Sequence, residues 1–474
     1  MVGPPAVVVE PEGCSSAPTM VGFPSQRQAL LVLVLAGAVV YLPAFNGQFM
    51  FDDYPWILQH DHILDLRTYA WHTRPLTLLT FALQRATTGA DPLPFHAVNV
   101  AIHLAATVLV FFTVRRAIAA AADPIWTDAA ALAAAGLFLL HPAQTEAVTY
   151  VSGRATSLMA LGLLTAHLAA LESLREARRW PWVVLSVFAF FMAVMAKEIA
   201  VVYPLILIAW LVGVDRFPVR RAVHAAAPQL GAFAVCVLVL AAHPGYRGLL
   251  AGLAGFALSA DGLAARIQGI AGLLRVLVVP WTVNFDHDPP PVGPADVAVV
   301  SGLAVLTVLA CRAIRWSRAP EAAGLLWAVC ALLPTSIVLA RTDPVADRLL
   351  YLPMVGVAVA VAGLMARASR SPSHRRLAAT GAVIALTILG ALAFDRNLQY
   401  RSEVTLWEDA VRKSPAKARA RVNLGYAYEL AGDLDRAEHQ YRTALMLWPD
   451  LWWARKGLLE VERMREARRG EEAP

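Results

Sequence analysis

The chain has 474 residues, of which 58% are hydrophobic and only 16% are charged. Soluble globular chains carry about 25% charged residues, so this composition excludes an ordinary soluble protein and indicates a membrane protein. The net charge of +6 does not indicate a nucleic-acid partner, because the basic residues form short clusters between apolar runs, as in cytoplasmic loops.

Residues 1–26 are rich in Pro, Gly, Ser and Val, and we expect them to form a disordered cytoplasmic N-terminus. The first apolar run follows Arg27, and no cleavage-site pattern stands at the start of the chain, so we interpret this run as an uncleaved signal anchor. The four cysteines form no CxxC pair and indicate neither a disulfide framework nor a zinc site.

Eleven apolar segments predict membrane spans. They are residues 29–45, 95–114, 127–140, 155–173, 181–196, 199–214, 225–242, 296–311, 321–340, 351–366 and 377–394. With the N-terminus in the cytoplasm, every arginine cluster between spans falls on the cytoplasmic side. The pattern predicts an all-α, polytopic transmembrane helical bundle over residues 27–396, with the C-terminal tail on the extracytoplasmic side. The frequent Ala, Arg, Val and Leu indicate a bacterial inner membrane.

Residues 262–281 form a further apolar stretch, interrupted by Arg266 and Arg275. A twelfth span here would invert the later loops and place their arginine clusters outside. We therefore expect an interfacial or re-entrant helix on the outer side.

The tail, residues 397–474, matches a 34-residue tetratricopeptide repeat that starts at Ala418. The helix-packing positions of the repeat are occupied by Leu424, Gly425, Tyr428, Ala437, Tyr441 and Ala444, and Pro449 closes it. Residues 400–415 resemble the second helix of a preceding half-repeat, and residues 452–468 a capping helix. One full repeat is fewer than the roughly three needed for stability alone, so we expect the tail to pack on the membrane domain. Such a tail is also a candidate surface for binding a protein.

Counting loops alternately inside and outside along the eleven predicted spans places many uncommon polar residues at the outer ends of spans. Ionisable residues at this depth usually mark function. The pair Asp52-Asp53 follows the first span. The alternative to a function is a solvated turn. A carboxylate here has the chemistry of a general base that deprotonates an acceptor hydroxyl. Because adjacent side chains in an extended segment point apart, we expect only one of the two to be the base, with Asp53 preferred to Asp52.

Three further segments share this side. His141 to Glu146, followed by Ser152-Gly153-Arg154, is either a helix-capping loop or a site where the Arg154 guanidinium binds phosphate. Lys197-Glu198 is either a buried ion pair or a contact to a lipid-linked phosphate. Asp347-Arg348, which leads to Tyr351, is either a loop ion pair or an anion site. Asp286-His287-Asp288 has metal-binding residue types, but three adjacent side chains rarely converge on one ion, so a solvated loop is favoured and no metal site is predicted.

In order along the chain, several segments resemble the transmembrane and tetratricopeptide-repeat family of protein O-mannosyltransferases. They are Phe49-Met-Phe-Asp52-Asp53-Tyr54, Arg74-Pro-Leu-Thr, Phe95-His96, Asn99…His103, His141-Pro…Glu146, Gly153-Arg154, Ala196-Lys197-Glu198, Pro280…Asp286-His287 and Asp347-Arg348-Leu-Leu-Tyr351-Leu-Pro353. The resemblance covers roughly residues 30–460, and its specificity lies in the ordered set.

The resemblance implies a glycosyltransferase C fold and an inverting transfer from a polyprenyl-phosphate sugar donor to a hydroxyl of a protein or glycan acceptor. The acidic pair of the first outer loop, Asp52 or Asp53, matches the family's base. Arg154, Lys197 and Arg348 match its donor-phosphate residues, and the supporting positions are Arg74, His141, Glu146, Glu198 and Tyr351. No cofactor is implied with certainty, and a divalent cation is left open. Family members carry many repeats, whereas this tail has about one and a half, which leaves the sugar and the acceptor open.

Two other functions are weighed against the transferase. A non-enzymatic scaffold would use the tail to assemble an envelope complex and would not need Asp52-Asp53. A transporter would need polar residues through the depth of its spans, whereas here they gather on one side.

Overall fold

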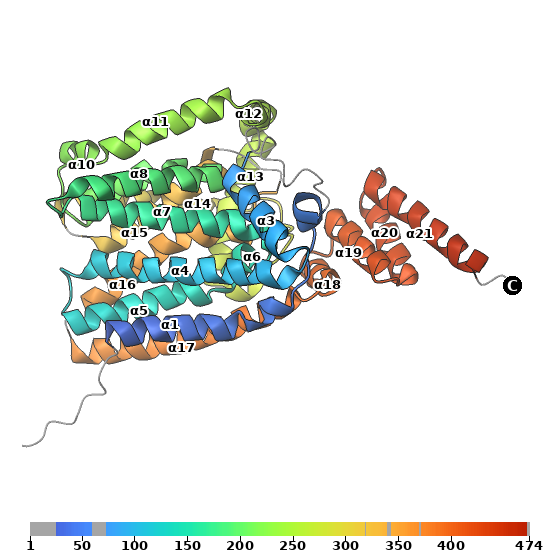
Figure 1. The fold of residues 1–474 in the computed structure, drawn as a ribbon, viewed down its shortest axis with the longest axis horizontal. Helices are drawn as coiled ribbons and strands as arrows, with labels where there is room; N and C mark the ends of the chain where they lie inside the picture. The colour runs from blue at the N-terminus through green and yellow to red at the C-terminus, as the bar shows by residue number, and fades with distance from the viewer. Residues whose placement is uncertain (1–24, 59–72, 318, 339–342, 369–370, 472–474) are drawn as a thin grey trace, which may run out of the picture.

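The computed structural model describes residues 25–58, 73–317, 319–338, 343–368 and 371–471. Within these ranges the chain is a bundle of long helices that run side by side, with shorter helices and a helical tail at one end (Figure 1). This confirms the predicted all-α membrane bundle. The predicted disordered segment, residues 1–26, falls almost wholly outside the described residues.

Eight helices in the described part of the chain are long and apolar enough to cross a membrane. They contain α1 (Gln26–Val40), α4 (Pro92–Ile118), α7 (Arg154–Ser173), α8 (Arg179–Ala196), α14 (Pro294–Trp316), α15 (Pro320–Leu332), α16 (Tyr351–Ala368) and α17 (Pro372–Gln399). Two bent pairs raise the number to ten. In one, α5 (Pro124–Leu140) meets the turns of Pro142–Val148 at 52°, and in the other α10 (Val219–Ala225) meets α11 (Ala227–Ala242) at 62°.

The remaining predicted span, 199–214, corresponds to a shorter apolar helix, Glu198–Gly213, which contains α9 (Tyr203–Gly213). Each of the eleven predicted spans therefore overlaps one apolar helix, and the chain is an integral, multi-pass membrane protein. The segment predicted to be interfacial forms α13 (Ala260–Val278), which follows α12 (Pro244–Ala257) and is not among the candidate spans of the described residues.

Local sequence signals explain where these helices begin. Asp91 precedes α4 and accepts a 3.1 Å hydrogen bond from Leu93 N–H, and Pro92 occupies the first helical position. Asp123 and Pro124 start α5 in the same way, with a 3.0 Å bond from Trp126 N–H. A short acceptor at the cap and a proline after it satisfy the otherwise unpaired N–H groups of a first turn.

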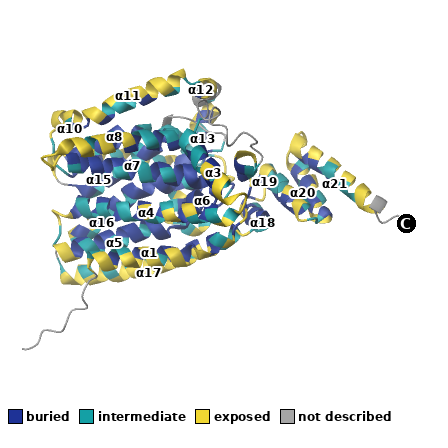
Figure 2. Cartoon of the chain, viewed as in Figure 1, coloured by how far each residue is buried: buried dark blue, intermediate teal, exposed yellow. Residues whose placement is uncertain are grey.

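Burial separates the centre of the bundle from its lipid-facing rim. In the span that contains α16, 72% of residues are buried, against 17% for α17 and 11% for α14. Figure 2 shows this contrast as buried central helices and exposed outer ones. The exposed side chains of the outer helices are apolar, for example Leu238 and Val383, as expected for surfaces in contact with lipid.

Small residues allow a close helix contact in the core. Gly324 of α15 and Gly356 of α16 face one another, and a Cβ atom at either position would collide with the carbonyl oxygen of the other. Close approach of backbones at small residues is a common mode of packing between membrane helices. This contact holds α16, and with it the segment that precedes α16, in a fixed place at the end of the bundle.

Four helices form the tail: α18 (Glu403–Lys413), α19 (Ala418–Leu430), α20 (Leu434–Leu447) and α21 (Trp452–Glu471). Gly425 and Gly457 both lie against the ring of Tyr441, where a Cβ atom would collide. The helices lie where the repeat places them, and their assignment as a tetratricopeptide repeat stays a prediction. Because α17 continues to Gln399, the predicted boundary between residues 396 and 397 falls inside its last turn.

Candidate functional site

A cavity of about 130 Å³ lies at the end of the bundle that carries the tail. Segments far apart in the sequence contribute to its wall. The lining residues are Asp52, Trp56, Thr73, Arg74, Thr77, Leu78, Phe81, Tyr150, Ser152, Ala155, Thr156, Lys197 and Arg348. One carboxylate and three cationic side chains therefore share a single hollow, together with several hydroxyl groups.

A tight turn presents the carboxylate. Asp53 N–H donates to the carbonyl of Met50 at 2.9 Å, and Phe51 between them adopts φ of +50°. A non-glycine residue in this left-handed region costs about 1–3 kcal/mol and persists only when its surroundings fix it. The N–H of Asp52 donates to the hydroxyl oxygen of Tyr150 at 3.1 Å. The turn separates the two acidic side chains, so that Asp52 lines the cavity and Asp53 is buried beneath it.

Asp53 accepts three hydrogen bonds inside the protein. They come from Ser152 N–H at 2.8 Å, from the Ser152 hydroxyl at 2.5 Å and from Met50 N–H at 3.1 Å. Burial raises the pKa of the Asp53 carboxyl to about 7, although the hydrogen bonds from Ser152 and Met50 favour the carboxylate and lower it. A pKa near 7 suits a general base, but a base must first reach the substrate, and both Asp53 oxygens point into the protein.

Two of the cations lie at helix ends: Arg74 directly precedes α3 (Pro75–Thr88), and Lys197 directly follows α8. The Nε and Nη2 atoms of Arg74 donate to the Glu198 carboxylate at 3.2 and 3.1 Å, a two-point contact that leaves the Arg74 side chain 41% exposed. Lys197 is only 5% exposed, and its ammonium donates to the Thr156 hydroxyl at 2.7 Å while lining the cavity. Glu198 therefore orients Arg74, and Lys197 is held at the cavity wall by α7.

Arg348 is the third cation, and Glu146 fixes it. The guanidinium forms an ion pair with Glu146, and the Arg348 N–H donates to the same carboxylate at 2.8 Å. Glu146 is 1% exposed, whereas 29% of the Arg348 side chain remains accessible. Arg348 is also close enough to Asp52 for the two opposite charges to attract one another. The pair couples α6 (Thr145–Val148) to the turn that precedes α16.

Arg154 lies deeper than these three cations and is 0% exposed. All of its guanidinium nitrogens donate to the protein. Their acceptors are Asn99 Oδ1 at 2.6 Å, Gln84 Oε1 at 2.8 Å, the Phe95 carbonyl at 3.0 Å and Thr80 Oγ1 at 3.3 Å. Arg154 therefore ties α3 (Pro75–Thr88) and α4 to the start of α7 beneath the cavity.

Two supporting residues from the sequence lie within the bundle. His141 is 1% exposed; its Nδ1 accepts from Ala143 N–H at 3.2 Å, and its Nε2 lies 3.2 Å from the Leu277 carbonyl. Tyr351 is fully buried, with its hydroxyl 2.8 Å from His103 Nδ1. These contacts make His141 a helix-capping residue and Tyr351 part of the packing between α4 and α16.

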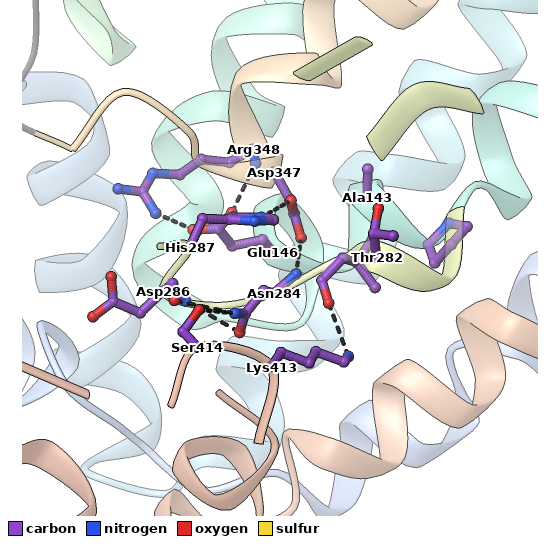
Figure 3. Close-up of polar contacts among 12 residues, drawn as sticks. Ala143, Glu146, Thr282, Asn284, Asp286, His287, Asp347, Arg348, Lys413 and Ser414 are labelled. Atoms are coloured by element: carbon purple, nitrogen blue, oxygen red, sulfur yellow. Dashed lines mark hydrogen bonds and ion pairs between the residues drawn. The ribbon is translucent and has the colours of Figure 1, made fainter. Parts of the chain in front are cut away.

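Asp347, next to Arg348 in sequence, faces away from the cavity toward the loop before α14. It accepts from Asn284 N–H at 2.9 Å and lies 2.7 Å from His287 Nε2, as Figure 3 shows. Adjacent Asp286 binds Arg419 of the tail, so the Asp-His-Asp sequence spreads its side chains among different partners. Among the described residues, no group of three His, Cys, Asp or Glu side chains could hold a metal ion.

The sequence did not single out several lining residues. Tyr150 and Thr156 flank the Ser152-Gly153-Arg154 motif, so their proximity to that motif was an available signal. Trp56 and Thr73 lie near the acidic pair and Arg74, but nothing in their spacing distinguishes them from loop residues. Ser152 was visible within the motif, and its role as a donor to Asp53 required the fold.

No family model matches the chain. Protein O-mannosyl-transferase Tmtc1 of Drosophila melanogaster is 32% identical over 181 residues, which cover 34% of this chain and 20% of the fly protein. Protein O-mannosyl-transferase TMTC4 of Homo sapiens is 26% identical over 477 residues, or 84% of this chain and 63% of the human protein. A Caenorhabditis elegans protein O-mannosyl-transferase is 23% identical and covers 89% of this chain and 63% of its own length.

The homologues of the chain are thus protein O-mannosyl-transferases, which confirms the resemblance read from the sequence. The chain spans about a fifth of the length of the fly relative and less than two thirds of the human and nematode ones. Among solved structures, ArnT from Cupriavidus metallidurans bound to undecaprenyl phosphate is similar at 15% identity and a TM-score of 0.47, over 91% of this chain and 75% of ArnT. The Archaeoglobus fulgidus oligosaccharyltransferase is similar at 12% identity and a TM-score of 0.44, over 87% and 58% of the two chains.

Proposed function

We propose that the protein transfers a sugar from a polyprenyl-phosphate donor to a hydroxyl acceptor at the cavity lined by Asp52, Arg74, Lys197 and Arg348. The observation that carries the proposal is the meeting of one accessible carboxylate with three cations in one hollow at the end of a membrane bundle. The homologues are named protein O-mannosyl-transferases, which makes mannose the proposed sugar and a protein Ser or Thr hydroxyl the proposed acceptor.

In this proposal Asp52 is the base, a reversal of the preference for Asp53 drawn from sequence. The acceptor hydroxyl attacks the anomeric carbon on the face opposite the phosphate and gives its proton to Asp52. The bond from that carbon to the phosphate oxygen breaks, with inversion, and the lipid phosphate leaves with the bonding electrons. General-base catalysis of this kind contributes about 10²–10⁴-fold to a rate.

Lys197, Arg74 and Arg348 are proposed to bind the donor phosphate. Their charges also stabilise the negative charge that grows on the leaving phosphate, and such stabilisation is strongest when the groups are held in place beforehand. Thr156, Glu198 and Glu146 supply that preorganisation. Arg154, which the sequence placed among the phosphate ligands, is instead proposed to organise the cavity floor, because its donors are committed to four protein acceptors.

The cavity is proposed to open on the extracytoplasmic side, with the tail beside it. Last-turn basic residues of α4, α14 and α16, including Arg115, Arg315 and Arg367, lie at the opposite end of the bundle (Figure 1), and basic residues favour the cytoplasm. Protease added outside sealed spheroplasts should then release the tail. Release only after the membrane is opened would contradict this orientation.

The activity is tested with purified protein in lipid nanodiscs, polyprenyl-phosphate mannose labelled in the sugar, and a Ser/Thr-rich peptide. Label should move to the peptide, and free polyprenyl phosphate should appear in equal amount. Donor that stays intact with every peptide, together with unchanged glycans in cells lacking the protein, would contradict the transferase proposal.

The alternative scaffold function has one observation in its favour. The end of α20 and the start of α21 expose Trp448, Trp452 and Trp453, whose side chains are 57–62% accessible. Exposed aromatic residues of this kind are common in protein interfaces. A scaffold would lose partner recruitment when these three residues become serine and would keep its function when Asp52 becomes asparagine, whereas the proposed transferase requires Asp52.

A further inference from the structure

Phe51 lies in the turn at residues 50–53 and contacts the tail through both its backbone and its side chain. The Phe51 N–H donates to Glu403 Oε1 of α18 at 2.8 Å. The Phe51 ring packs edge-to-face on Trp407, also from α18, at a centroid distance of 5.6 Å, and on Phe285 at 6.0 Å. Phe285 in turn packs on Trp407 at 5.2 Å. Both the backbone and the side chain of Phe51 are thus held by residues more than 200 positions away in the sequence.

Phe51 needs such support because of its conformation. Its φ of +50° lies in the region that residues with a bulky side chain rarely adopt. The next residue is Asp52, so the backbone at Phe51 sets the direction in which the Asp52 carboxylate leaves the turn. If Phe51 relaxed to negative φ, the Asp52 side chain would no longer point to the cavity and the Asp53 side chain would no longer point to Ser152.

Glu403 is an unusual residue for a simple docking contact. It is 7% exposed, and its second carboxylate oxygen has no hydrogen-bond partner among the described residues. Burial of a carboxylate is costly and is normally offset by several donors. Here Glu403 Oε1 accepts one hydrogen bond, from the N–H of Phe51, the residue with positive φ. Tail residues that only dock, such as Arg419 with Asp286, form ion pairs away from the turn.

We propose that Glu403 and Trp407 of the tail are positioning residues of the transferase, which hold Phe51 at positive φ and so aim Asp52 into the cavity. This inference rests on the proposed function and deepens it, since it makes the tail a part of the catalytic arrangement. It also predicts that removal of the tail lowers transfer, even if the tail binds no acceptor.

The first test compares Glu403→Ala with two matched variants in the nanodisc transfer assay. Glu403→Ala should lower kcat at least about tenfold and leave the KM for polyprenyl-phosphate mannose within about twofold, because the cations of the cavity are untouched. Glu403→Gln keeps an oxygen acceptor for Phe51 N–H and should retain most of the wild-type kcat. Arg419→Gln removes a tail contact of the docking kind and should leave kcat unchanged.

Equal kcat values for Glu403→Ala and the wild type would overturn the proposal. So would an equal loss of kcat in Arg419→Gln, because the effect would then follow from looser docking of the tail. If the wild type transfers no sugar at all, the proposed function fails first. A wild type that transfers sugar and a Glu403→Ala variant that matches it would leave the function standing and refute only the positioning role.

The second test isolates the backbone conformation. Phe51→Ala and Phe51→Gly both remove the ring and its contacts with α18, but only glycine adopts positive φ without steric cost. The positioning account predicts that Phe51→Gly has a kcat at least about fivefold higher than Phe51→Ala, with equal donor KM. Equal kcat values for the two variants, or a higher value for alanine, would overturn it.

Discussion

Asp53 and Ser152 are joined by two hydrogen bonds, of 2.8 Å from the Ser152 N–H and 2.5 Å from its hydroxyl, although 99 positions separate them in the chain. This link fixes the loop after α1 to the start of α7. It also gives the two neighbouring acidic residues different tasks. Asp53 attaches the turn to the bundle, and Asp52 is left to face the cavity.

The buried Asp53 carboxyl predicts a pH-dependent stability. Its pKa is about 7 in the folded protein and near 3.8 in an exposed chain, so the folded state binds its proton more tightly. Stability is therefore greatest at low pH with respect to this group and falls as the pH rises from about 4 to about 7. Thermal unfolding in detergent across this range measures the fall. Asp53→Asn should remove this part of the slope, and an unchanged slope would show that Asp53 does not titrate there.

Lys197 should contribute to donor binding through its charge. Lys197→Met keeps the apolar stem and removes the ammonium, and a hydrogen bond to a charged group is worth about 1.5–3 kcal/mol. The Kd for undecaprenyl phosphate, measured in nanodiscs, should rise roughly 10–100-fold. Lys413→Met, a change of the same kind at a residue that donates to the Val283 carbonyl, serves as the control and should leave this Kd unaltered. A wild-type Kd in Lys197→Met would remove Lys197 from the phosphate site.

Arg154 should matter for stability rather than for phosphate. Its replacement by glutamine leaves acceptors such as Asn99 and Gln84 buried without a donor, at a cost of about 1–3 kcal/mol for each unsatisfied group. We expect a lower melting temperature and poor yield, with a normal Kd for undecaprenyl phosphate in the fraction that folds. A variant that melts like the wild type but no longer binds undecaprenyl phosphate would restore Arg154 as a phosphate ligand.

The helices were predictable from the sequence because their signals are local. Apolar length located the eight to ten helices that are long enough to cross a membrane and one shorter apolar helix, and Asp-Pro pairs mark the starts of α4 and α5. The alternate assignment of loops to the two sides of the membrane grouped Asp52, Lys197 and Arg348, which the structure brings to one cavity. Charge alternation along the chain is enough for that grouping, since each span reverses the direction of the chain.

The roles of individual residues could not be predicted, because they depend on contacts between distant segments. Arg154 and Lys197 are both basic residues on the same predicted side, so the sequence gives them the same candidate role. Only the fold shows that Asn99 and Gln84 accept hydrogen bonds from the Arg154 guanidinium and so keep it from binding phosphate. Which of Asp52 and Asp53 faces the cavity depends on positive φ at Phe51, and nothing in a Phe-Asp-Asp sequence signals that conformation. Glu403 lies 352 positions from the Phe51 that it contacts.

If Asp52 is the base of a sugar transfer, the transfer rate of Asp52→Asn at saturating polyprenyl-phosphate mannose must show it. The substitution keeps the shape of the side chain and removes its basicity. The account predicts a kcat lower by at least about 100-fold, with a Kd for undecaprenyl phosphate within about threefold of the wild type. The kcat of Asp53→Asn, measured on protein that remains folded, should fall less than that of Asp52→Asn. Full transfer by Asp52→Asn, with or without loss in Asp53→Asn, would contradict the account.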